Sequence, residues 1–259
     1  MQKTSNISLT AENLDIFLPN KELVRNLNLE LKTNEFIAIL GQNGTGKSLT
    51  LHTLAGLRKP SNGKVIIESK RITELPRRSI AKTLSLVLQD HEDIFPSTVY
   101  ENVLIGRHPH IGPLGNESKN DHNIVDMCLK EVNLHNFSDR NITSLSGGER
   151  RRLALAQALA QNPKIFLLDE PLNHLDPQHQ IEVMKLFSKK IKHGKSIIAS
   201  MHDINLVNRF ADRCLLLYGN GNWKLGLTKN VLSPEILSEL YEVEIKLINS
   251  NGSYFFTSV

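Results

Sequence analysis

The sequence predicts an α/β fold built around a parallel β-sheet, and two observations support this prediction. Short runs of consecutive apolar residues end abruptly at polar residues or glycine, and they span residues 36–40, 84–88, 165–168, 197–199 and 214–218. Strands that are covered on both faces are continuously apolar in this way. Segments of helical character lie between the runs, at residues 47–57, 124–132, 149–161, 178–191 and 204–210. Strands that alternate with helices are typical of α/β domains.

Three further regions complete the prediction. Within residues 7–31, polar and apolar side chains alternate around Ile7–Leu9 and Leu27–Leu31, and a turn lies at Pro19-Asn20, which predicts antiparallel strands beside the main sheet. Residues 91–162 contain no strong strand candidate and are predicted to form a mainly helical insertion with a polar loop at residues 112–121. The end of the chain is predicted to form a helix at residues 235–241 and strands at residues 244–248 and 254–257.

These elements predict one domain over residues 1–259. Its core is expected to comprise residues 1–90 and 163–232, with a helical subdomain at residues 91–162 and a C-terminal extension at residues 233–259.

The composition limits the class of protein. Of the 259 residues, 40% are hydrophobic and 22% are charged, which provides a sizeable core and excludes an intrinsically disordered chain. No apolar run approaches the ~20 residues of a membrane-spanning helix, and we expect no secretory signal at the N-terminus. Cys128 and Cys214 lack metal-ligand spacing and are expected to be reduced thiols of a cytosolic protein. A net charge of +4 permits a polyanionic partner without requiring one.

A phosphate-binding loop follows the first apolar run of the predicted sheet. Gly41-Gln42-Asn43-Gly44-Thr45-Gly46-Lys47-Ser48 matches G-x-x-x-x-G-K-[ST], and it lies between a predicted strand and the helix that continues through Leu49. The glycines allow backbone N–H groups to converge on phosphate oxygens at a helix N-terminus. Lys47 is expected to reach the β- and γ-phosphates, and the Ser48 hydroxyl is expected to bind Mg²⁺.

Polar side chains end three other predicted strands. Gln89 and Asp90 follow residues 84–88, Asp169 and Glu170 follow residues 165–168, and His202 and Asp203 follow the strand near residue 199. Any one of these polar residues, taken alone, could simply face solvent at the end of its strand. Because the carboxyl ends of parallel strands share one edge of the sheet, all of them are expected to face the phosphate-binding loop.

Each of these side chains has a predicted role in hydrolysis. Asp169 is expected to hold Mg²⁺ through water, together with Ser48 and Gln89. Glu170 is expected to act as general base towards the attacking water. Gln89 is expected to sense the γ-phosphate through Mg²⁺ or water, and His202 is expected to hydrogen-bond the γ-phosphate.

A second glycine-rich segment precedes the predicted helix at residues 149–161. Ser146 and Glu149 form the pattern of a capping box. Gly147 and Gly148, just inside the helix, weaken it by roughly 1 kcal/mol each relative to alanine. A simple cap does not require them, whereas close approach of the backbone to an anion does.

These motifs together resemble those of the nucleotide-binding subunits of ABC transporters. Leu145-Ser-Gly-Gly-Glu149 resembles the family signature, and the order of phosphate loop, Gln89, signature, Asp169-Glu170, the Asn173–Asp176 loop and His202 is the order found in the family. The resemblance extends from about Leu9 to Tyr241. It implies a P-loop NTPase core of the RecA-like type with an N-terminal antiparallel subdomain and an inserted helical subdomain.

The resemblance also implies a mechanism and partners. Two chains would sandwich two ATP molecules head to tail, each with Mg²⁺, so that Ser146, Gly147, Gly148 and Glu149 face the nucleotide of the opposite chain. Asp176 would communicate across this interface. A membrane permease would dock near residues 90–105, at the cytoplasmic face of the inner membrane. An extracytoplasmic substrate-binding protein would take part indirectly, and no nucleic acid is expected.

A narrower likeness concerns the transported substrate. The segments Thr98-Val-Tyr-Glu-Asn-Val103 and Gly106-Arg-His-Pro-His110 resemble a stretch of importers for iron-siderophore, haem and cobalamin. The segment Ser233-Pro-Glu-Ile-Leu-Ser-Glu-Leu-Tyr241 resembles their C-terminal part. Importers of manganese, zinc or molybdate remain alternatives.

One position departs from the family pattern. The family places an aromatic residue that stacks on adenine about 23 residues before the first glycine of the phosphate loop, where this chain has Leu18 beside Phe17. Neighbouring residues of a strand face opposite sides. Phe17 and Leu18 are therefore the two candidates for the adenine contact.

Two other functional classes are less consistent with the sequence. A soluble ABC ATPase acting on nucleic acid or ribosomes usually carries two nucleotide-binding domains, whereas this chain has one copy of each motif. Arg150-Arg151-Arg152 is interpreted as part of a solvated helix face rather than a nucleic-acid site. A single-site P-loop kinase or GTPase leaves the signature and His202 unexplained.

Overall fold

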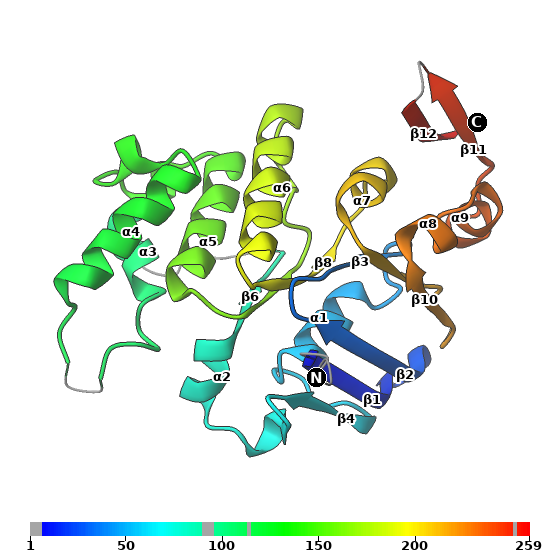
Figure 1. The fold of residues 1–259 in the computed structure, drawn as a ribbon, viewed down its shortest axis with the longest axis horizontal. Coiled ribbons are helices and arrows are strands. Elements are labelled where there is room, and N and C mark those ends of the chain that lie inside the picture. Colours follow the sequence, from blue (N-terminus) through cyan, green and yellow to red (C-terminus); the bar gives the residue numbers. More distant parts are fainter. Residues whose placement is uncertain (1–6, 90–95, 113–114, 251–252) are drawn as a thin grey trace, which may run out of the picture.

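The computed structural model describes residues 7–89, 96–112, 115–250 and 253–259 and confirms the α/β fold with a parallel sheet (Figure 1). The main sheet has the strand order β10-β9-β3-β8-β7-β6. Five strands are parallel, namely β3 (Phe36–Leu40), β6 (Leu84–Val87), β7 (Ile165–Leu168), β8 (Ser196–Ser200) and β9 (Arg213–Leu217). These are the five predicted strands. The sequence did not predict the antiparallel edge strand β10 (Trp223–Leu227).

A smaller antiparallel sheet lies beside the main sheet. Its strand order is β2-β1-β4-β5, and it comprises β1 (Ile7–Leu18), β2 (Lys21–Lys32), β4 (Asn62–Ile67) and β5 (Lys70–Arg71). The long pair β1 and β2 confirms the predicted antiparallel strands of residues 7–31. The sequence did not predict β4 and β5.

Alternate residues of the central strand β3 pack into two different parts of the core. Ile37 and Ile39 belong to a cluster with the small sheet and with α1 (Lys47–Leu54), whereas Ala38 and Leu40 belong to the cluster on the opposite face. The second cluster includes the helices α5 (Gly147–Gln161), α6 (Pro177–Lys192) and α7 (Ile204–Phe210). Burial on both faces explains why the strand is apolar without alternation.

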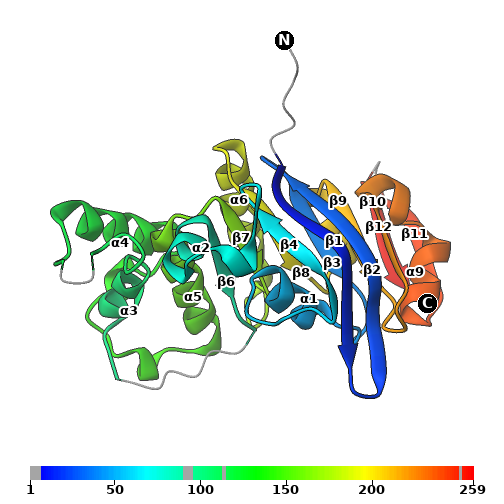
Figure 2. The same cartoon turned by 90° about the horizontal axis from the view of Figure 1, so that it is seen from below.

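Helices α3 (Val99–Ile105) and α4 (Lys119–Glu131) lie at one end of the molecule, beside α5 (Figures 1 and 2). A buried ion pair between Arg107 and Asp121, with 2.8 Å between Nε and Oδ1, connects the end of α3 to the start of α4. The hydrogen bonds from Ser118 and Arg107 lower the pKa of Asp121. The prediction of a polar loop over residues 112–121 is therefore wrong at its end, because α4 begins at Lys119 and Asp121 is buried.

The C-terminal elements lie at the other end of the molecule. Helix α8 (Thr228–Val231) is followed by α9 (Pro234–Tyr241) and by the hairpin of β11 (Ile245–Ser250) and β12 (Ser253–Ser258). Asn205 of α7 exchanges two hydrogen bonds with the backbone of Phe256 in β12. The helix and hairpin match the prediction for the C-terminal segment.

Three remaining findings complete the fold. Helix α2 (Arg77–Thr83), which precedes β6, was not predicted. Cys128 and Cys214 are buried and not joined in a disulfide. Among the helices within the described residues, none has both the length and the apolar character needed to cross a membrane.

Candidate nucleotide-binding site

The phosphate-binding loop connects β3 to α1, as its sequence motif predicts. Gly41, Gly44 and Gly46 have φ angles of +154°, +75° and +103°, a range that favours glycine. A Cβ atom at Gly41 would lie 2.4 Å from the carbonyl oxygen of Leu217 in β9. Gly46 is the N-cap residue of α1, and no side chain caps this helix. The first amide groups of α1 therefore face the loop without a side-chain partner.

Lys47 folds back over the loop. Its Nζ atom donates hydrogen bonds to the carbonyl oxygens of Gly41 at 2.8 Å and Gln42 at 3.1 Å. Burial lowers the pKa of the Lys47 ammonium, whereas the nearby Glu170 and Asp169 carboxylates raise it. A buried ammonium that donates hydrogen bonds to neutral carbonyl groups is suited to exchange them for an anionic phosphate.

The carboxylates at the end of β7 are held by the neighbouring strand β8. Ser200 Oγ donates a hydrogen bond to Oδ1 of Asp169 at 2.6 Å and accepts one from the amide of Glu170 at 2.8 Å. Asp169 is only 1% exposed. A buried carboxylate requires such partners, so Ser200 fixes the position of the Asp169 side chain.

Glu170 contacts two side chains that the strand ends bring together. Its Oε1 atom lies 2.7 Å from Nε2 of His202, and its Oε2 atom accepts a hydrogen bond from the Asn173 side-chain amide. Glu170 is 8% exposed and has a φ angle of +48°. Non-glycine residues adopt positive φ in only a few per cent of cases, and a glutamate that does so is held there by its surroundings.

One depression of about 560 Å³ joins the predicted site residues. It is lined by Leu18, Leu23, Asn43, Gly44, Gly46, Lys47, Ser48, Leu49, Gln89, Glu170, Asn173 and His202. The structure thus brings the phosphate loop together with Gln89, Glu170 and His202, three of the four strand-end residues that have a predicted role in hydrolysis. Asp203 instead caps α7 and is not among the lining residues. Gly41, Gln42, Thr45 and the buried Asp169 are not among the lining residues. Asp90 lies outside the described residues.

The two adenine-contact candidates face different surroundings. Leu18 is 38% exposed and lines the depression. Phe17, its neighbour in β1, is half-buried and is not among the lining residues. The alternation of side chains along a strand explains this difference.

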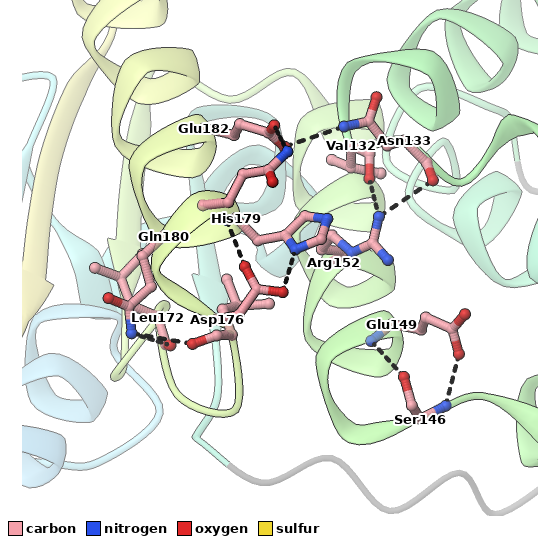
Figure 3. Close-up of polar contacts among 12 residues, drawn as sticks. Val132, Asn133, Ser146, Glu149, Arg152, Leu172, Asp176, His179, Gln180 and Glu182 are labelled. Atoms are coloured by element: carbon pink, nitrogen blue, oxygen red, sulfur yellow. Dashed lines mark hydrogen bonds and ion pairs between the residues drawn. The ribbon is translucent and has the colours of Figure 1, made fainter.

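The signature residues form the start of α5, away from the depression. Ser146 and Glu149 make the predicted capping box, in which the Ser146 amide donates to Glu149 Oε2 at 2.8 Å (Figure 3). This hydrogen bond lowers the pKa of Glu149. A Cβ atom at Gly148 would lie 3.0 Å from the carbonyl oxygen of His174, so Gly148 is also required by the chain's own Asn173–Asp176 loop. Asp176 caps α6 and accepts a hydrogen bond from the His179 amide at 2.9 Å (Figure 3).

The sequence did not identify Ser200 or Arg151 as parts of the site, and it assigned Asn173 only to the Asn173–Asp176 loop, without a contact to Glu170. The prediction of a solvated helix face is wrong for Arg151, which is 5% exposed. Its guanidinium group donates hydrogen bonds to the carbonyl oxygens of Leu88 at 2.5 Å and Gln89 at 3.3 Å, and to that of Asp169. The only sequence signal for these residues is their position beside the recognised motifs.

Comparisons with known proteins agree with this geometry. The profile of the family described as ABC transporter matches residues 24–173. The petrobactin import ATP-binding protein FpuC of Bacillus anthracis is 36% identical over 235 residues, covering 90% of this chain and 86% of that protein. The hemin import ATP-binding protein HmuV of Rhodopseudomonas palustris is 34% identical over 242 residues, covering 90% of both chains.

Solved structures show the same relationship. A chain of a putative metal-chelate type ABC transporter in an inward-facing conformation superimposes with a TM-score of 0.85 and 30% identity, over 98% of this chain and 97% of that one. The family profile and the extent of these matches place the phosphate loop, the strand-end carboxylates and the signature helix within one known architecture. This chain belongs to the ABC transporter family as one of its ATP-binding proteins, and it is an ATPase.

Proposed function

We propose that this chain is the energy-coupling subunit of an importer for iron-siderophore complexes, haem or cobalamin. It works as a head-to-tail nucleotide-sandwich dimer on membrane permeases, at the cytoplasmic face of the inner membrane. The similarity to FpuC and HmuV, which are import ATP-binding proteins for petrobactin and hemin, supports the substrate class. The likeness to a metal-chelate type transporter over 98% of this chain supports it further. Importers of manganese, zinc or molybdate are the alternative.

The donor set at the loop fits ATP with Mg²⁺. Ser48 supplies a hydroxyl, Asp169 a buried carboxylate and Gln89 an amide oxygen, and oxygen atoms are the ligands that Mg²⁺ prefers. When bound, Mg²⁺ neutralises charge on the phosphates. Lys47 leaves the Gly41 and Gln42 carbonyls to bind phosphate, and the N-terminal amides of α1 bind phosphate oxygens.

Glu170 and His202 carry the hydrolytic chemistry in this proposal. Glu170 accepts a proton from the attacking water as general base. Nε2 of His202 lies 2.7 Å from Oε1 of that carboxylate, and it would turn to the γ-phosphate of bound ATP. Asn173 holds the other carboxylate oxygen. The single observation that carries the proposal is the convergence of Lys47, Gln89, Glu170 and His202 on one depression.

The position of the signature supports a dimer. Ser146, Gly147, Gly148 and Glu149 are not among the residues that line the depression of their own chain. A second chain arranged head to tail would bring its signature helix over this depression. The resulting pair of sites would each contain the phosphate loop of one chain and the signature of the other, with Asp176 at their boundary.

A groove between the main sheet and the helical segment supports permease docking. It has a volume of about 300 Å³ and is lined by residues of β6, α5 and the end of α3. Leu88 and Ile105, two of its apolar residues, are 37% and 46% exposed. A short amphipathic helix of a permease would cover them. Residues 90–95, part of the expected docking segment, lie outside the described residues.

Reconstitution tests this proposal directly. The chain is coexpressed with a permease and an extracytoplasmic binding protein taken from the neighbouring reading frames where these encode them, and the purified complex is placed in proteoliposomes containing ATP. We expect ATP-dependent uptake of a ferric siderophore, haem or cobalamin, and none when the chain carries Glu170→Gln. Uptake of manganese, zinc or molybdate instead would identify the alternative class. A lone gene, or a neighbourhood of DNA-repair genes, would count against import.

A further inference from the structure

The peptide group that joins Asp169 to Glu170 is held on both sides. Its carbonyl oxygen accepts a hydrogen bond from Nη2 of Arg151, and its N–H donates to Ser200 Oγ at 2.8 Å. The carbonyl and the N–H belong to one planar unit. Two partners on opposite edges therefore prevent this unit from rotating.

This restraint explains the backbone conformation of Glu170. A φ angle of +48° costs a residue with a side chain on the order of 1–3 kcal/mol, and it persists only where the surroundings enforce it. The conformation directs the carboxylate towards His202 and Asn173. Rotation of the preceding peptide would carry the carboxylate away from both partners.

Arg151 also holds the end of the adjacent strand. Its Nη1 atom donates to the carbonyl oxygens of Leu88 and Gln89, at 2.5 Å and 3.3 Å. One buried guanidinium thus connects the ends of β6 and β7. The planar, delocalised fork of arginine suits several carbonyls at fixed angles, and lysine does not reproduce this geometry.

Arg151 belongs to the helix that begins with the signature. It follows Ser146 by little more than one turn of α5. We propose that Arg151 is a positioning residue for ATP hydrolysis, which transmits the position of the signature helix to the Gln89 and Asp169–Glu170 backbone of the same chain. This inference rests on the proposed roles of Glu170 and of the signature. In the proposed dimer, the signature of one chain contacts the nucleotide bound to its partner. Arg151 would make hydrolysis at the first chain's own phosphate loop depend on that contact.

Arg152 provides a matched control on the same helix. Its Nη1 atom donates to the carbonyl oxygens of Val132 at 3.0 Å and Asn133 at 3.2 Å, at the end of α4 (Figure 3). Both arginines belong to α5, and both donate hydrogen bonds to main-chain carbonyl oxygens outside that helix. They differ in whether those carbonyls belong to the strand ends of the nucleotide site.

The test compares Arg151→Gln, Arg151→Lys and Arg152→Gln in the full chain, with kcat and KM for ATP and the melting temperature measured for each. We expect Arg151→Gln to lower kcat about tenfold to a hundredfold, the cost of a small displacement of catalytic groups, with KM changed less than threefold. Arg151→Lys should recover part of this loss, and Arg152→Gln should change kcat less than twofold. An equal loss of kcat in Arg152→Gln, or a loss that appears only in KM, would overturn the inference.

A double-mutant cycle tests whether Arg151 acts through Glu170. In the Glu170→Gln background, Arg151→Gln should reduce single-turnover phosphate release less than twofold further, because residues that act as a unit are not additive. A further tenfold reduction would contradict the positioning role. Full turnover of Glu170→Gln alone would contradict the proposed general base, whereas the comparison of Arg151 with Arg152 would still stand.

A second variant covers the case in which Arg151→Gln does not fold. Ser200→Ala removes the opposite side of the same restraint and leaves Arg151 in place. It should also lower kcat at least tenfold with little change in KM. Unchanged kcat in folded Ser200→Ala would overturn the proposed restraint of the Asp169–Glu170 peptide.

Discussion

Nε2 of His202 lies 2.7 Å from Oε1 of Glu170, so two residues from the ends of neighbouring strands form one polar pair. Their strands β7 and β8 are adjacent and parallel, and the pair is a direct consequence of that arrangement. The imidazole is 44% exposed, whereas the carboxylate is 8% exposed. His202 can therefore turn towards a nucleotide while Glu170 stays in place.

The first prediction is that a chain unable to hydrolyse ATP accumulates as an ATP-bound dimer. Glu170→Gln removes the proposed general base and keeps the size of the side chain, while one carboxylate oxygen is replaced by an amide NH2 group that only donates. We expect phosphate release to fall at least a hundredfold, the contribution typical of a positioned base, and an ATP-bound dimer to accumulate in size-exclusion chromatography. Lys47→Ala should give neither ATP binding nor a dimer. A Glu170→Gln chain that stays monomeric with ATP and hydrolyses it at the normal rate would disprove the composite site.

The second prediction concerns the adenine contact. Leu18 lines the nucleotide depression and Phe17 does not. Leu18→Tyr should tighten ATP binding about threefold to tenfold, because an aromatic face adds roughly 0.5–1.5 kcal/mol by stacking. Phe17→Ala should change the ATP dissociation constant less than twofold. Titration with a fluorescent ATP analogue measures both constants, and a tenfold loss in Phe17→Ala would assign the contact to Phe17 instead.

The third prediction separates the two signature glycines by their surroundings. A Cβ atom would lie 3.0 Å from the His174 carbonyl oxygen at Gly148, and 3.5 Å from the nearest His174 atom at Gly147. Gly148→Ala should therefore lower the melting temperature by several degrees, as about 1–2 kcal/mol of overpacking would do. Gly147→Ala should lower it less or leave it unchanged. Equal melting temperatures for the two variants would show that the Asn173–Asp176 loop adjusts without cost.

The fourth prediction follows from the buried thiols. Burial raises the pKa of Cys128 to about 12 and raises that of Cys214 as well. The thiolate is the reactive form, so at pH 8 neither residue should react with a disulfide reagent in the folded chain. Both should react within seconds in denaturant, where the pKa returns to about 8.5.

The raised pKa values of the two thiols also predict how the stability of the folded chain depends on pH. Because folding raises both thiol pKa values, deprotonation favours the unfolded state, and stability should fall as the pH rises through and above the unfolded value. Cys128→Ala should reduce this alkaline loss. Rapid labelling of the native chain at pH 8 would contradict the burial of both thiols.

The five parallel strands and most of the long helices were predictable because their patterns are local. A strand such as Ile165–Leu168 has four consecutive buried residues, and the motif after Leu40 specifies its own turn. The strands β4, β5 and β10 were not predictable in the same way. They are short, lie at sheet edges or in the small sheet, and contain exposed or half-buried residues such as Asn62 and Lys224.

The candidate site likewise contains features that local sequence patterns predict and features that they do not. Gln89, Glu170 and His202 were predicted to meet because each follows a parallel strand. Phe17 and Leu18 were not distinguished, since the register of β1 against β2 contains several bulges that no local pattern reveals. The division into core, helical subdomain and C-terminal extension at residues 90, 162 and 232 stays a prediction.

The sequence by itself determined the chemistry of the protein: a phosphate loop between a strand and a helix, acids and amides at strand ends, and a glycine-rich helix start. Each of these features is formed by residues that are adjacent in the sequence, so the sequence alone is enough to recognise it. Only the tertiary structure decided that Ser200 and Arg151 hold the peptide between Asp169 and Glu170. Those partners are 30 and 18 residues distant along the chain, and their contact exists only because the packing of the sheet and of α5 brings them to one buried point.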